Sequence, residues 1–101
     1  MDKIQILVIG RNPDIVQTVV RLINNNPGWN ASHALTDEVA VALFEGRPFD
    51  LVLLGGGIEP ESDSLLREAF TAHTPGITII QHYGGGSGLL ATEINMALAG
   101  K

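Results

Sequence analysis

The residues of this chain that could support chemistry gather at the ends of apolar runs. Arg11 follows the first run, three glycines follow the third, and a histidine and more glycines follow the fourth. Glycine-rich turns near helix starts can present backbone N–H groups to an anion, with an arginine as counter-charge. One hypothesis is therefore an anion or small-molecule site, whose candidate residues are Arg11, Gly55, Gly56, Gly57, His82, Gly84, Gly85 and Gly86.

The same glycines also have a purely structural explanation, because tight turns and close packing require them. Neither G-x-G-x-x-G nor G-x-x-x-x-G-K-[ST] occurs. His82 is the best candidate for a general base, but the sequence places no nucleophile or partner acid beside it. The acids Glu59, Glu61 and Asp63 are more typical of a solvated loop than of a cation site. We expect no catalytic residue, no bound metal and no cofactor.

Composition narrows the class of protein further. The 101 residues carry 11 acidic and 6 basic side chains, a formal net charge of −5, and the basic residues are scattered singly. Nucleic-acid binding usually needs a basic patch, so we expect none. No apolar run approaches the ~20 residues of a membrane span, and the first residues do not resemble a signal peptide. Together with the absence of cysteine, this predicts a cytoplasmic protein without a membrane partner.

Four apolar runs alternate with four amphipathic stretches, which predicts the order βαβαβαβα in a single domain spanning residues 1–101. The first run is β-branched and almost continuously apolar, as in a strand that is buried on both faces. Asn12, Pro13 and Asp14 then form a helix start, with Asn12 as N-cap. Thr36 or Asp37 is expected to cap the second helix, and one of residues 62–64 the third. The expected strands are residues 4–9, 29–35, 50–54 and 77–82.

This alternation predicts an α/β fold with a parallel sheet, right-handed crossovers and helices on both faces. Residues 6–13 and 49–55 resemble the first and third strand ends of response-regulator receiver domains, and the resemblance extends over about residues 3–83. It implies a flavodoxin-like fold with strand order 2-1-3-4. The family's fifth strand, which carries a lysine, has no counterpart here.

The resemblance also shows what this chain lacks. In receiver domains an acidic pair after the first strand binds magnesium, and the matching positions here are Gly10 and Arg11. The phosphoacceptor aspartate ends the third strand, where this chain has Gly55. His82 and Tyr83 lie near the position of a Ser or Thr. Phosphotransfer needs a carboxylate nucleophile and a metal site, so the resemblance implies a receiver without phosphorylation chemistry.

The leading hypothesis is a non-catalytic, receiver-like regulatory module that binds a protein partner, whose identity the sequence does not give. The alternative is a small-molecule or anion-binding domain that uses Arg11 and the glycine loops. Without a fifth strand, the apolar and uncharged fourth strand would lie at the edge of the sheet. Natural proteins usually cover such edges. We therefore expect a homodimer joined near the fourth strand or the last helix.

Overall fold

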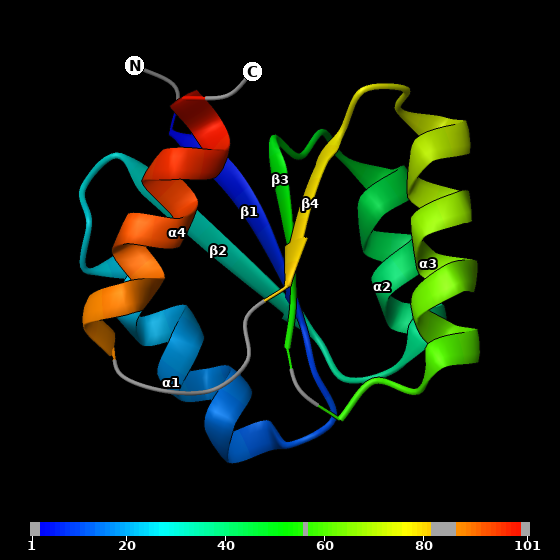
Figure 1. Ribbon diagram of the computed structural model, residues 1–101, viewed down its shortest axis with the longest axis horizontal. Coiled ribbons are helices and arrows are strands. Elements are labelled where there is room, and N and C mark those ends of the chain that lie inside the picture. Colours follow the sequence, from blue (N-terminus) through cyan, green and yellow to red (C-terminus); the bar gives the residue numbers. More distant parts are fainter. Residues whose placement is uncertain (1–2, 56, 82–86, 100–101) are drawn as a thin grey trace.

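The computed structural model describes residues 3–55, 57–81 and 87–99, with side chains from residue 92 onward in the last helix. Four strand–helix units follow one another along the chain (Figure 1). The elements are β1 (Ile4–Ile9), α1 (Pro13–Asn24), β2 (Trp29–Ala34), α2 (Asp37–Gly46), β3 (Leu51–Leu54), α3 (Pro60–His73), β4 (Thr78–Gln81) and α4 (Ser87–Ala99). All three strand pairings are parallel, and the order is β2-β1-β3-β4. The predicted α/β fold and strand order are confirmed.

The central strands are apolar because the sheet has a hydrophobic layer on each face. Every residue of β3 is buried, and alternate residues contact opposite layers. Leu51 and Leu53 join a cluster with α1 and α4, whereas Val52 and Leu54 join a second cluster with α2 and α3. Two cores of this kind explain why the central runs lack the polar alternation of a half-exposed strand.

Local sequence signals set most of the helix starts. The Asn12 side chain accepts hydrogen bonds from the backbone N–H groups of Asp14 (3.0 Å) and Ile15 (3.3 Å), as predicted for an N-cap. Thr36 caps α2 by accepting a hydrogen bond from Val39 N at 3.2 Å. The prediction for α3 is wrong, because that helix begins earlier than residues 62–64. Pro60 occupies its first turn, a position that proline favours because its missing N–H is not needed there.

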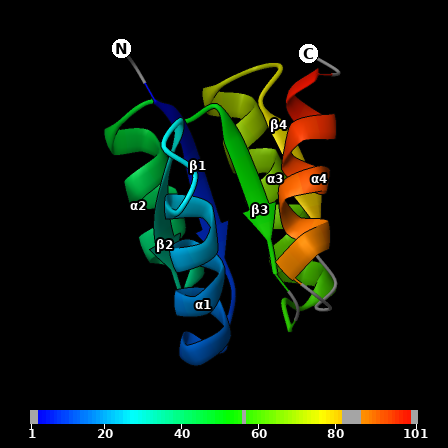
Figure 2. The same ribbon diagram turned by 90° about the vertical axis from the view of Figure 1, so that its left-hand side faces the viewer.

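The last helix lies on the same face of the sheet as α1, while α2 and α3 cover the other face (Figures 1 and 2). The side chain of Ile94 is fully buried in the cluster that α1 forms with the sheet. The connections through α2 and α3 both run across the sheet in the direction of β4, and right-handed crossovers in one direction place their helices on one face. A helix that connected β4 to a fifth parallel strand would therefore lie on the same face as α2 and α3. Helix α4 instead lies on the opposite face, where it contacts both α1 and β4.

None of the helices in residues 3–55, 57–81 and 87–99 is long and apolar enough to cross a membrane.

Candidate functional site

Arg11 is the centre of a polar cluster at the carboxyl ends of the strands. Its Nη2 atom donates to Asp37 Oδ1 at 2.7 Å and to Glu59 Oε2 at 3.4 Å. Its Nη1 atom donates to the backbone oxygen of Leu35 at 3.1 Å. Ser62 Oγ donates to the other carboxylate oxygen of Asp37 at 2.7 Å. We call Arg11, Asp37, Glu59 and Ser62 the Arg11 cluster; it joins the end of β1 to the starts of α2 and α3.

The cluster has one tightly held pair and one exposed pair. The side chains of Arg11 and Asp37 are only 26% and 24% exposed, whereas that of Glu59 is 58% exposed. Hydrogen bonds from Arg11 and then from Ser62 hold the pKa of Asp37 below its ordinary value. The hydrogen bond to Asp37 is also the largest cause that raises the pKa of Arg11. At neutral pH Arg11 is thus a fixed positive charge between two carboxylates.

This pairing predicts a specific loss of stability in acid. Replacing Arg11 by methionine keeps much of the side-chain stem but removes the charge, so we expect the free energy of unfolding to fall by about 1 kcal/mol at pH 7. Because the folded-state pKa of Asp37 is lowered, the stabilisation is present above its unfolded pKa of about 3.9 and is lost as the pH falls through the folded value. Urea unfolding of both proteins between pH 7 and pH 2 should show the difference shrink below about pH 4.

The matched control is Arg21→Met, which removes an exposed arginine at the other end of α1. Its effect should not depend on pH in this window. An Arg11→Met deficit that is the same at pH 7 and pH 2 would mean that the ion pair contributes nothing to stability.

The two glycines at receiver carboxylate positions lie in backbone that is already packed and hydrogen-bonded. Gly10 N donates to Ala34 O at 3.2 Å, and Gly55 N donates to Ile9 O at 2.7 Å. A Cβ atom on Gly10 would lie 2.7 Å from Val16 Cγ2, and one on Gly55 would lie 3.2 Å from the same Ile9 oxygen. The strand ends are therefore shaped around glycine, and neither N–H group is free to receive an anion.

Of the other predicted site residues, Gly57 has a φ of +82°, a conformation that suits glycine, and it lies over the stem of Arg11. Gly56, His82, Gly84, Gly85 and Gly86 lie outside the described residues, so their roles stay predictions. Arg11 is already paired with carboxylates. Anion binding by the other residues of the glycine loops stays a prediction. Across the described ranges, no group of three His, Asp or Glu side chains is placed to hold a metal ion.

Sequence reasoning missed the partners of Arg11. Asp37 was a candidate helix cap, a role that its type suits equally well, and Glu59 was assigned to a solvated loop. They lie 26 and 48 positions from Arg11 in the sequence, and no local pattern indicates that they meet it. The available signal was topological, since parallel strands bring the loops after β1, β2 and β3 to one edge.

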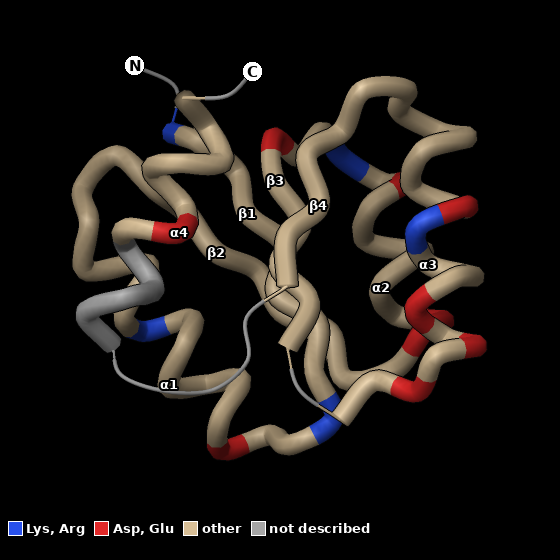
Figure 3. The backbone as a smooth tube through the Cα atoms, viewed as in Figure 1, with Lys and Arg blue, Asp and Glu red and all other residues tan. Residues whose placement is uncertain are grey.

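Negative charge gathers on the layer formed by α2 and α3 (Figure 3). Seven of the 11 acidic residues lie on these helices or at Glu59, just before α3. Four of them make no ion pair with any described residue: Glu38, Glu45, Glu61 and Glu68. The two halves of the sequence carry similar net charges, and only the fold collects the acids on one side.

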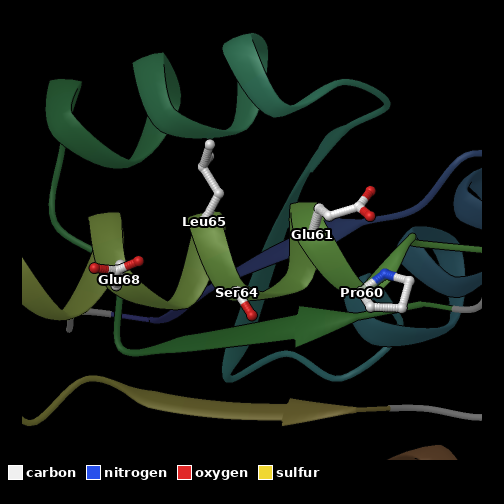
Figure 4. A pocket seen from close by; sticks show the side chains of 5 residues that line it. All are labelled: Pro60, Glu61, Ser64, Leu65 and Glu68. Carbon is white, nitrogen blue, oxygen red and sulfur yellow. The ribbon is translucent and has the colours of Figure 1, made fainter.

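This acidic layer also exposes apolar side chains. Val39 on α2 is 47% exposed and Leu65 on α3 is 52% exposed. Leu65 points toward α2 and lines an open hollow of about 660 Å³ together with Pro60, Glu61, Ser64 and Glu68 (Figure 4). Glu61 and Glu68 lie one helical turn before and after Leu65, so they share its face of the helix. The hollow thus combines an apolar side chain with two carboxylates at the surface of α3.

Several solved structures that are similar to this chain are receiver domains. The chain is similar to the chemotaxis protein CheY4 of Vibrio cholerae (14% identity, TM-score 0.73), over 95% of this chain and 99% of that one. It is similar to a CheY-like receiver domain protein of Methanospirillum hungatei JF-1 (20% identity, TM-score 0.72), over 95% and 76%. It also matches the N-terminal domain of a response regulator/sensory box/GGDEF protein of Carboxydothermus hydrogenoformans (23% identity, TM-score 0.69), over 94% of each chain.

No protein-family model matches the sequence, and no curated protein matches it. At 14–23% identity these similarities establish the fold alone. The chain thus has the CheY-like, flavodoxin-like fold of receiver domains, and the predicted resemblance is confirmed at that level.

Proposed function

We propose that this chain is a receiver-like regulatory module that acts by binding a protein partner in the cytoplasm and is not switched by phosphorylation of an aspartate. The observation that carries the proposal is the ion pairing of Arg11 with Asp37 and Glu59. These bonds lie at the strand ends where the receiver resemblance places a magnesium-binding acidic pair. The regulatory role is supported by the fold, which a chemotaxis protein and a hybrid histidine kinase receiver domain share.

The chemistry of phosphoryl transfer is what this arrangement does not supply. A carboxylate nucleophile must lie beside a divalent cation that offsets the charge on the phosphoryl group. Gly55 offers no nucleophile, and the packing around Gly10 and Gly55 leaves little room for a side chain. Arg11 already occupies the carboxylates of Asp37 and Glu59 at this edge, which a cation would need as ligands. We therefore assign no enzymatic activity to the module.

Arginine also changes the kind of regulation that is possible. A metal ion and a phosphoryl group can bind and leave, whereas the guanidinium is covalently attached and stays charged at all physiological pH values. It holds the loops before α2 and α3 in one arrangement through Asp37 and Glu59. The module would thus present one constant surface to its partner. The unpaired acids around Leu65 favour a partner that carries basic residues beside an apolar one.

Thermal unfolding with candidate ligands separates this proposal from the anion-binding alternative. A ligand at a hundredfold excess over its Kd stabilises by about 2.7 kcal/mol, which corresponds to roughly 10 °C or more for a domain of this size. We expect no such shift with magnesium, inorganic phosphate, a phosphate analogue or ATP. A shift with phosphate or ATP that disappears in Arg11→Met would overturn the proposal in favour of an anion site.

A further inference from the structure

The outer edge of β4 is the part of the sheet that the described residues leave uncovered. β4 is last in the strand order and pairs only with β3 within the described chain. All four of its residues are part-exposed, whereas every residue of β3 is buried. Figure 2 shows α3 and α4 on either side of β4. Ile79 contacts the α2–α3 cluster and Ile80 the α1–α4 cluster, so both faces of the strand are packed, whereas no described strand pairs with its outer edge.

The opposite edge of the sheet is protected in a way that β4 is not. On β2 the side chain of Asn24 accepts a hydrogen bond from Ala31 N at 2.8 Å, which occupies a main-chain group of that strand. Arg47 also reaches β2, donating to Ser32 Oγ at 2.6 Å. No side chain among residues 3–55, 57–81 and 92–99 bonds to the main chain of Thr78, Ile79 or Ile80.

The composition of β4 adds no protection. It contains no lysine, proline or glycine and reads Thr-Ile-Ile-Gln. Natural edge strands are usually blunted by charges, prolines or bulges, because unpaired N–H and C=O groups otherwise recruit another strand. The described backbone of α4 lies over the face of the sheet that it shares with α1 and does not extend the sheet beside β4.

We propose that a second copy of this chain covers the edge, with the two β4 strands antiparallel about a two-fold axis. A two-fold axis perpendicular to the sheet reverses the strand direction and keeps each side chain on its own face of the sheet. The two copies would therefore form one continuous sheet in which apolar residues lie beside apolar residues. This interface is independent of the proposed function, because it uses none of the Arg11 cluster.

Charge favours this contact over the exposed apolar face around Leu65. Each copy has a net charge of −5, and four acids that make no ion pair with any described residue, Glu38, Glu45, Glu61 and Glu68, lie on α2 and α3. Two copies that met through the Leu65 face would place those carboxylates against each other. The four residues of β4 carry no charge, so pairing there brings no acidic side chain of the strand opposite another.

Light scattering or sedimentation over a dilution series tests the interface. The monomer mass is 10.7 kDa, and we expect twice that mass at tens of micromolar. Ile79→Lys adds a charge to the paired strand and should return the mass to that of the monomer. Because Ile79 also packs against the α2–α3 cluster, Thr78→Lys provides a second variant outside either core cluster, with circular dichroism to show that each remains folded.

The matched control is His33→Lys, which adds the same charge to an exposed position on β2 at the other edge. It should leave the dimer intact. A wild-type mass of one chain at tens of micromolar would overturn the proposal. So would a dimer that persists in folded Ile79→Lys and Thr78→Lys proteins, or one that His33→Lys dissociates equally well. A mass that keeps growing with concentration would contradict two-fold closure.

Discussion

Replacing Leu53 by alanine is expected to lower the free energy of unfolding by about 2–5 kcal/mol. Leu53 lies on a central strand, is 1% exposed and belongs to the cluster that includes Ile6 and Ile94. Small domains have only about 5–15 kcal/mol in total, so the loss should be visible as an earlier urea transition followed by circular dichroism.

Leu65→Ala is the matched control, because it deletes the same atoms from a side chain that is 52% exposed on α3. Its urea transition should stay within about 0.5 kcal/mol of the wild type. Equal effects of the two substitutions, at one protein concentration, would show that β3 does not occupy the centre of the sheet.

Adding a single methyl group at Gly10 is expected to cost about 1–3 kcal/mol, because the new Cβ would lie 2.7 Å from Val16 Cγ2. Val16 is β-branched and buried on α1, so its side chain cannot easily rotate away. Urea unfolding of Gly10→Ala, Val16→Ala and the double variant measures the clash directly. The double variant should be more stable than the sum of the single effects predicts, by about 0.5–3 kcal/mol.

Gly46→Ala serves as the control for glycine replacement in general. A Cβ there meets nothing within 4 Å, so the change should be neutral or stabilise by up to about 1 kcal/mol. If Gly10→Ala were as harmless as Gly46→Ala, the position after β1 would have room for a side chain. Steric exclusion of a carboxylate from that position would then be contradicted.

Much of the fold could be predicted because its signals are local. Continuous apolar runs indicated the buried strands, and Asn12 followed by Pro13 marked the start of α1 correctly. The start of α3 was misplaced because Pro60, Ser62, Asp63 and Ser64 all favour a helix start, and sequence does not rank them.

The site was harder to predict because its contacts are long-range. Arg11 was predicted as the counter-charge of an anion site, but an arginine suits a carboxylate of the protein as well as a bound anion. In the structure its partners are the carboxylates of Asp37 and Glu59. These residues are distant from it in the sequence, and only the folded sheet brings them beside it. The sequence did not predict the acidic layer for the same reason, since α2 and α3 lie in different halves of the sequence.

Mass spectrometry measures whether this receiver fold takes up a phosphoryl group, which the proposed function excludes. The purified protein is incubated with magnesium and acetyl phosphate, beside an active receiver domain as positive control. We predict an unchanged mass for the wild type and for Arg11→Met, because neither has a carboxylate at residue 55. An acid-labile gain of about 80 Da, the mass of one phosphoryl group, on Asp37, Glu59 or any other carboxylate would contradict the account.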